Sequence, residues 1–282
     1  MSLAQRAEGE VPPPGPPWDL PVAEAPLAFV DLEMTGLDVA RDRVVEVCIE
    51  RVVGKERVAL VETLVFPEDR VGGAAHVHGI DATALEGAPP FAEIAERVSA
   101  ILEGAILVAH AAEWDVRFLE MEMARAQKTF EIGPCLDTLV LARRAFALPR
   151  HSLDALCTHF AIDRGKPHRA APDVFAMRRV FDHCVEALAP KSARDLWEVR
   201  VAEKVARHTI VSACEAAAQS GTPVLVTYRP SRRAPESWVM VLTHVLTDLD
   251  PPRVIGYQLP GRGRRELRAD RILRVDLPLP PT

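Results

Sequence analysis

The chain contains 282 residues, of which 48% are hydrophobic and 26% are charged, a composition typical of a folded globular protein. It excludes a disordered chain, a collagen-like repeat and a small disulfide-stabilised scaffold. The net charge is −6, but residues 221–282 contain ten Arg, no Lys and six acidic residues and carry +4, against −10 for residues 1–220.

This uneven charge predicts two modules with different roles. A proline-rich segment precedes them, with seven prolines between Val11 and Leu27. Proline-rich chain is extended and has few backbone donors, so residues 1–26 are predicted to form a disordered tail. Regular structure is expected to begin near Leu27.

The first module shows the pattern of an α/β domain. Three runs rich in β-branched and apolar residues predict a meander of strands over 27–33, 43–52 and 57–66. The elements predicted after them are a helix over 91–102, a strand over 106–110, a helix over 113–126, helices over 137–146 and 152–160, and a helix that begins near Pro172 or Asp173 and ends near 188.

The second module shows mainly strand patterns. A helical linker is expected over residues 191–205, and a small antiparallel β-barrel over 206–282. Its strands are predicted over 223–229, 237–246, 253–259 and 265–275, separated by turn-forming clusters.

Four carboxylates and one histidine lie at the ends of predicted elements of the first module. Asp31 and Glu33 end the first strand two residues apart, so both point to the same face of the sheet. Asp115 begins the helix after strand 106–110, while His168 and Asp173 surround the start of the last helix. Taken one at a time, these residues also fit a structural role without chemistry: a solvated strand end, a carboxylate that favours the helix dipole, or a helix N-cap.

Taken together, the segments around these residues resemble the DEDDh family of 3′-to-5′ exonucleases. The three segments that resemble the family's motifs are FVDLEMTGLD (29–38), LVAHAAEWDVRFLEME (107–122) and HRAAPDVFA (168–176). The segment HVHGIDATAL (76–85) is similar to one found in the proofreading subunits of bacterial replicative polymerases. The resemblance implies a ribonuclease-H-like α/β fold with a mixed five-stranded sheet, in an exonuclease domain over residues 27–190.

The resemblance also implies an activity and a cofactor. The expected reaction is metal-dependent hydrolysis of phosphodiester bonds at the 3′ end of DNA, or of RNA as in oligoribonucleases, with release of nucleoside monophosphates. Two Mg²⁺ or Mn²⁺ ions suit such a site, because hard cations prefer carboxylate oxygens and two ions stabilise both the attacking and the leaving oxygen. The alternative is a regulatory nucleic-acid-binding protein that uses the exonuclease fold as a platform.

The family's residue roles carry over to matching positions. Asp31 would bridge the two ions, Glu33 and Asp173 would help to hold the ion that binds the attacking water, and Asp115 would serve the other ion. His168 would be the general base, since a neutral imidazole can accept a proton from water. The residues expected to line the pocket of the terminal nucleotide are Met34, Thr35 and Leu37, with His78 and Ile80 on the opposite side.

Two positions of the second motif depart from the family pattern. The family commonly has Asn where this chain has Ala111, and Phe where it has Trp114. The missing amide at Ala111 is expected to affect the positioning of the nucleotide but not the binding of metal.

Residues from about Ala206 resemble a WYL-type domain, although the Trp-Tyr-Leu triplet is absent near Val254. Such domains are linked to the sensing of ligands or single-stranded nucleic acid. Seven arginines form either a phosphate-binding surface or only a solubilising one: Arg229, Arg232, Arg233, Arg262, Arg264, Arg265 and Arg271. Trp238 and Tyr257 either stack on bases or belong to the core of the barrel.

The sequence also predicts a cytoplasmic location. No apolar stretch approaches the roughly 20 residues of a membrane span, and no secretory signal is visible. Five widely spaced cysteines without a C-x-x-C pair predict buried thiols. The expected partners are the single-stranded or frayed 3′ end of DNA, or RNA, and a polymerase or repair protein.

Overall fold

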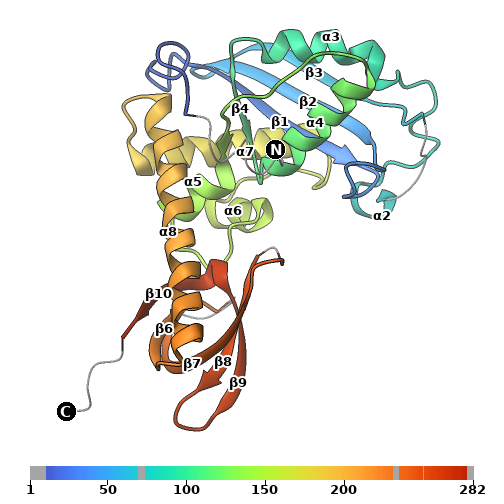
Figure 1. The fold of residues 1–282 in the computed structure, drawn as a ribbon. Coiled ribbons are helices and arrows are strands. Elements are labelled where there is room, and N and C mark those ends of the chain that lie inside the picture. The colour runs from blue at the N-terminus through green and yellow to red at the C-terminus, as the bar shows by residue number, and fades with distance from the viewer. Residues whose placement is uncertain (1–10, 69–73, 231–234, 250, 278–282) are drawn as a thin grey trace. The chain divides into compact units, whose positions relative to one another are not determined.

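The structure, a computed structural model, describes residues 11–68, 74–230, 235–249 and 251–277. The chain divides into two compact units (Figure 1). The first contains the residues up to Ala147 together with His151–Arg200, and the second contains Leu148–Arg150 and the residues from Val201 onward.

The first unit is built on a mixed five-stranded sheet, which confirms the expected α/β fold. Its strands are β1 (Pro26–Met34), β2 (Val44–Val53), β3 (Glu56–Leu64), β4 (Ile106–Ala109) and β5 (Leu136–Asp137), in the order β3-β2-β1-β4-β5. The first three pair antiparallel, whereas β4 and β5 join them as parallel strands. The sequence does not predict β5, because two residues are too few to show a strand period.

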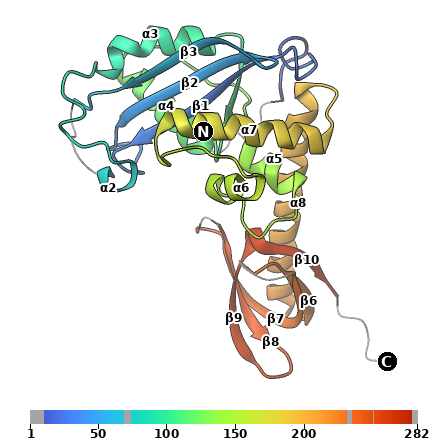
Figure 2. The ribbon, with the colours of Figure 1, turned by 180° about the vertical axis from the view of Figure 1, so that it is seen from behind.

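Helices cover both faces of this sheet. They are α2 (Ala75–His78), α3 (Phe91–Leu102), α4 (Glu113–Arg125), α5 (Thr138–Ala145), α6 (Leu153–Phe160) and α7 (Ala170–Leu188). On one face α3 and α4 pack together, and on the other α7 lies across β1 and β2 with α5 and α6 against it (Figure 2).

The residues of β1 alternate between these two faces. Val30 and Leu32 belong to the core formed with α3 and α4. Phe29 points the other way, where its ring packs edge-on against Phe181 of α7 with the ring centroids 5.3 Å apart. Because side chains alternate along a strand, Asp31 and Glu33 also lie on the α7 face.

The prediction of a disordered tail over residues 1–26 is wrong for residues 11–25, which pack against the rest of the first unit. Residues 1–10 lie outside the described part of the chain. The Trp18 side chain is only 4% exposed, and its backbone carbonyl accepts a hydrogen bond from the N–H of Arg194 at 2.8 Å. The Arg194 guanidinium bonds to the Asp19 carboxylate and to the carbonyls of Pro12 and Pro13. The proline pattern does not reveal this packing, because the partner segment lies about 175 residues away.

The second unit is an antiparallel sheet in the order β10-β6-β7-β8-β9. Its strands are β6 (Val224–Tyr228), β7 (Glu236–Leu246), β8 (Arg253–Gln258), β9 (Gly263–Arg268) and β10 (Ile272–Asp276). A 3₁₀ turn, η1 (Ala269–Arg271), divides the strand expected over 265–275. The ladders of the described strands do not include a β9–β10 pairing, so closure into a barrel stays a prediction.

One long helix, α8 (Ala193–Ser220), replaces the short helical linker expected over 191–205. It contributes Cys214 and Ala217 to the core of the second unit, where they pack with Met240 and Leu242. The expected boundary at residue 206 therefore falls inside a continuous helix, and the domain limits stay a prediction.

All five cysteines are buried, as predicted, and none of them forms a disulfide bond. Burial raises the pKa of the Cys184 and Cys214 thiols to about 12. Among the described residues, no helix combines the length and apolar character needed to cross a membrane.

Candidate active site

The end of β1 carries two carboxylates on the face that α7 covers. Asp31 pairs with Cys48 of β2, and Glu33 pairs with Glu46. The carboxylates of Asp31, Glu33 and Glu46 therefore lie on one face of two adjacent strands. The two-residue spacing of Asp31 and Glu33 predicts this for those two residues. Glu46 is an addition that only the strand register reveals.

Asp115 reaches the same strand from the start of α4. The parallel pairing between β1 and β4 ends at Phe29 and Val108, so no described strand pairs with the N–H of Leu32 on that side. The Asp115 Oδ1 atom accepts a hydrogen bond from this N–H at 3.2 Å, and the side chain is buried. The contact connects the second motif to the first.

The start of α7 is held by Glu46. The Glu46 carboxylate accepts a hydrogen bond from the N–H of Ala170 at 2.9 Å and forms an ion pair with Arg169 at 2.6 Å. This cap lets the helix begin at Ala170, slightly earlier than the expected Pro172 or Asp173. Pro172 falls in the first turn, where its missing N–H costs no intrahelical hydrogen bond.

His168 and Asp173 flank this helix start. His168 is exposed and has a φ of 58°, in the left-handed region that few residues other than glycine adopt. Asp173, in the first turn of α7, is buried. Its Oδ1 atom has no hydrogen-bond partner but lies 3.2 Å from a guanidinium nitrogen of Arg164.

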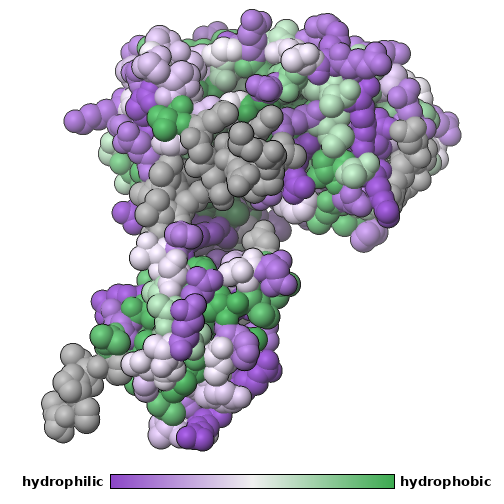
Figure 3. All heavy atoms as spheres, viewed as in Figure 1, coloured by the Kyte–Doolittle hydropathy of each residue, from purple (hydrophilic) through white to green (hydrophobic). Residues whose placement is uncertain are grey.

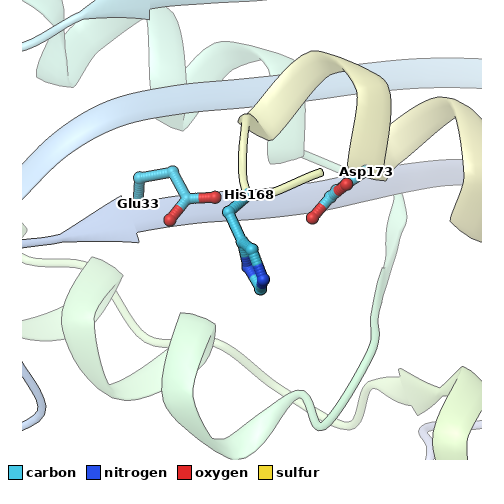
Figure 4. Close-up of side chains that lie close together, drawn as sticks. All are labelled: Glu33, His168 and Asp173. Carbon is cyan, nitrogen blue, oxygen red and sulfur yellow. The ribbon is translucent and has the colours of Figure 1, made fainter. Parts of the chain in front are cut away.

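Three of the expected site residues converge directly (Figure 4). One ligand atom from each of Glu33, His168 and Asp173 lies within 4.8 Å of the others. They come from β1, from the segment before α7 and from α7 itself. Asp31 and Asp115 lie close enough to this group to interact with it electrostatically.

The charges of the four carboxylates oppose one another. Burial, followed by repulsion from Asp115, Asp173 and Glu33, raises the pKa of Asp31 well above its usual range. Burial is also the main cause that raises the pKa of Glu33 to about 7 and that of Asp115 to about 8. The pKa of Asp173 is raised by burial and lowered in part by Arg164.

This donor set fits a divalent cation. Carboxylates that repel one another in a partly buried site keep their charge best when a cation compensates it. The oxygen-rich set suits Mg²⁺ or Mn²⁺. The Asp173 Oδ1 atom is buried and, apart from its ion pair with Arg164, has no hydrogen-bond partner among the described residues.

The raised pKa values predict that the metal-free protein loses stability as the pH rises. Between the ordinary carboxyl pKa and about pH 8, the folded chain keeps protons that the unfolded chain has released, so the free energy of unfolding falls with increasing pH. We expect the thermal midpoint in EDTA to fall from about pH 5 to about pH 9 and Mg²⁺ to reverse most of the loss. Thermal unfolding of the wild type and of Asp31→Asn tests this; a steeper loss in the variant would contradict it.

The five residues expected to bind the nucleotide are placed differently from one another. Leu37 is 63% exposed and Met34 is half-buried. Thr35 is buried. Its hydroxyl donates a hydrogen bond to Asp42 Oδ1 and accepts one from the N–H of Arg43.

The other two members of that group are buried beside the end of β1. Ile80 packs with Val45 and Leu85. Nδ1 of His78 accepts a hydrogen bond from the N–H of Ile80 at 3.0 Å. Burial lowers the pKa of His78 despite opposing contributions from Glu46 and from the backbone of Met34.

The loop between β1 and β2 is held in place by contacts that the sequence does not reveal. The Asp42 carboxylate accepts from the N–H of Asp38 at 2.8 Å, and a Cβ on Gly36 would lie 2.4 Å from the same carboxylate. Glu122 of α4 forms a buried, doubly hydrogen-bonded ion pair with Arg43. The loop that carries Thr35 and Leu37 is thereby attached to α4.

The two departures of the second motif lie at the start of α4. Ala111 has a φ of 62°, a conformation that asparagine tolerates better than alanine, so the family's usual residue suits the backbone here. Its N–H donates to Asp137, which also caps α5. Trp114 packs at the edge of the core.

Comparison with known proteins agrees with this arrangement. A family model described as Exonuclease, RNase_T, matches residues 28–181. A DNA polymerase III subunit epsilon-like protein of Rhodobacter capsulatus is 38% identical over 180 residues, which are 59% of this chain and 25% of that protein. The DNA polymerase III subunit epsilon of Rickettsia prowazekii is 32% identical over 54% of this chain and 71% of its own length.

The fold is also found among solved structures. The zinc-bound complex of E. coli exonuclease I with single-stranded DNA superposes with a TM-score of 0.54, at 14% identity, over 84% of this chain and 55% of that one. At this identity the likeness shows a shared fold.

Proposed function

Because the chain belongs to the RNase_T exonuclease family and therefore contains a nuclease domain, we propose that it removes nucleotides from the 3′ end of DNA by metal-dependent hydrolysis. The observation that carries this proposal is the convergence of Glu33, His168 and Asp173 beside Asp31 and Asp115. Hydrolysis of a phosphodiester needs a proton acceptor for water and compensation of negative charge, and this set offers both.

In the proposed mechanism Asp31, Glu33, Asp115 and Asp173 hold two Mg²⁺ or Mn²⁺ ions. Such ions, when bound, supply positive charge to the attacking and leaving oxygens. The chain's own task is to orient the four carboxylates, which the contacts of Asp115 with β1 and of Glu46 with α7 support. His168, exposed at the edge of the cluster, accepts the proton of the attacking water.

The proposed substrate is a single-stranded or frayed 3′ end. In support, one fold neighbour among solved structures is a complex with single-stranded DNA, and one sequence relative is named as a DNA polymerase III subunit. Leu37, exposed on its anchored loop, would contact the terminal nucleotide together with Met34 and Thr35, with His78 and Ile80 behind them. RNA is the alternative substrate, and a polymerase or repair protein is the proposed partner.

The assignment of the second unit is likewise a proposal. We infer a WYL-type domain over residues 206–282, joined through α8 to an exonuclease domain over 27–190. The antiparallel sheet and the arginine content of that region support it.

Polarity and substrate can be tested with oligonucleotides labelled at either end. We expect Mg²⁺ or Mn²⁺ to produce a ladder from 5′-labelled single-stranded DNA and a labelled mononucleotide from the 3′-labelled strand, and EDTA to abolish both. The same strands made of RNA compare the two sugars. Cleavage inside the strand, or binding without metal-dependent release, would contradict the proposal; the latter would favour a regulatory platform.

Arg164 is expected to set the pH at which the metal binds. Its side chain is 7% exposed and pairs with both Asp154 and Asp173, and its charge opposes the rise of the Asp173 pKa. In Arg164→Met, Asp173 should keep its proton to higher pH, so that affinity for Mn²⁺ falls markedly near pH 6.5 and approaches that of the wild type near about pH 9.

Binding of Mn²⁺ measured by electron paramagnetic resonance at both pH values tests this prediction without an activity assay. Arg164→Lys should retain most of the wild-type behaviour. Arg117→Met, which removes an arginine paired with Glu113 on α4, is the control. An identical pH dependence in Arg164→Met and in the wild type would exclude the expected role.

A further inference from the structure

The β8–β9 hairpin of the second unit concentrates positive charge. Residues 253–268 contain five Arg and one acidic residue, Glu266, and therefore carry +4. Arg262, Arg264 and Arg265 are exposed at or beside its turn. Within the described part of the chain, none of these three guanidinium groups forms a salt bridge, so no carboxylate neutralises them.

One face of this hairpin combines an arginine with an aromatic ring. Arg265 lies over the ring of Trp238 at 5.0 Å from the ring centroid and donates two hydrogen bonds to Gln258 Oε1, at 2.7 and 3.0 Å. Arg265 of β9 pairs across the strands with Gly256 of β8. Tyr228 lies beside Trp238 with the ring centroids 5.7 Å apart, and both half-buried rings also pack against the core of the second unit.

The opposite face repeats the combination. Tyr257 of β8 pairs directly with Arg264 of β9, so the two side chains share a face. Tyr257 is 42% exposed, so its ring is accessible to a ligand. The hairpin therefore presents an arginine and an aromatic ring on each of its faces.

These groups match the chemistry of single-stranded nucleic acid. Guanidinium groups bind phosphate oxygens in pairs, and exposed aromatic rings stack on unpaired bases. Figure 3 shows hydrophilic residues, mixed with hydrophobic ones, at the lower end of the second unit, where the β8–β9 hairpin turns in Figure 1. An anionic protein or membrane would use the guanidinium groups but not the rings.

We propose that the β8–β9 hairpin, with Trp238, is a second, non-catalytic binding site for single-stranded nucleic acid. This inference rests on the proposed nuclease function, because it assigns the hairpin to the same class of substrate. The carboxylates of the candidate active site repel a polyanion in the absence of metal, whereas the hairpin attracts one. The hairpin would therefore bind the nucleic-acid strand even when no metal ion occupies the active site.

Binding to the full chain in EDTA tests the inference, since hydrolysis is then prevented. The probes are a fluorescent thymidine 30-mer, an abasic strand of the same length and a 30-base-pair duplex, and the readout is anisotropy from low to moderate salt. Arg264→Ala/Arg265→Ala should weaken binding of the 30-mer about tenfold and lower the salt slope by about 1.4, because each phosphate contact contributes about 0.7. Tyr257→Ala should weaken it about fivefold or more through lost stacking.

Arg274→Ala is the matched control, because Arg274 is an exposed arginine of the same sheet that is already paired with Asp276. It should bind as the wild type does, and circular dichroism should show that all variants are folded. Wild-type affinity in the double variant, or equal affinity of the wild type for the 30-mer, the abasic strand and the duplex, would overturn the inference. Hydrolysis by the wild type in Mg²⁺ is measured separately, so failure of the hairpin site is distinguishable from failure of the proposed function.

Discussion

Asp31→Ala is expected to lower turnover by several orders of magnitude while leaving the fold intact. The pKa of Asp31 is raised by burial and by three neighbouring carboxylates, so this residue lies at the centre of their mutual repulsion. Binding of a cation that relieves this repulsion would depend most on the Asp31 carboxylate. Loss of that carboxylate should therefore abolish metal binding together with the activity. The metal-free variant should be as stable as the wild type or more so, because a desolvated carboxylate is removed.

Two measurements separate this effect from unfolding. Single-turnover hydrolysis in Mg²⁺ gives the loss of activity, and the rise of the thermal midpoint on adding Mg²⁺ reports metal binding. Asp31→Asn should behave similarly, whereas Glu113→Ala, which removes a half-exposed carboxylate from α4, should retain full activity. If Asp31→Ala keeps more than roughly a tenth of wild-type turnover, the two-metal proposal is wrong.

His168→Ala is expected to lose roughly 10²- to 10⁴-fold in turnover, the usual contribution of a general base. Affinity for Mn²⁺ should change little, because the carboxylates that would hold the metal remain. The residue has a φ of 58°, so an alanine there also introduces backbone strain. His168→Asn is therefore the better variant, since asparagine tolerates this conformation and supplies no comparable base.

His159→Ala provides the control, because His159 is an exposed histidine on α6. Turnover, Mn²⁺ affinity and thermal stability should be measured for all three variants. Normal turnover in His168→Asn would show that another group, or none, accepts the proton. A loss of Mn²⁺ affinity equal to the loss of turnover would instead make His168 a metal ligand.

The correct predictions for the first unit follow from local periodicity. Alternation along β1 is sufficient to place Asp31 and Glu33 on one face, and the apolar spacing predicts α3 over the same residues that the structure shows. The start of α7 is less accurate, because its first turn is capped by Glu46 from a strand more than 120 residues earlier. No local pattern contains that partner.

The predictions for the N-terminal segment and for the last strand are wrong for a related reason. The prolines before Leu27 predict extended chain, yet Trp18 is buried and its backbone bonds to Arg194. In the second unit a 3₁₀ turn interrupts a run that alternates well enough to be predicted as one strand. In both places contacts with distant residues, or a local bend, outweigh the pattern of the neighbouring residues.

The sequence by itself determined the types of most elements, the two modules of unequal charge and the carboxylates at the ends of elements. These features depend on neighbours along the chain, whose spacing sets which side chains share a face. Only the tertiary structure decided that one atom each of Glu33, His168 and Asp173 lies within 4.8 Å of the others, and that Arg164 is held between Asp154 and Asp173. Strand register and helix packing bring such groups together, and both depend on residues far apart in sequence.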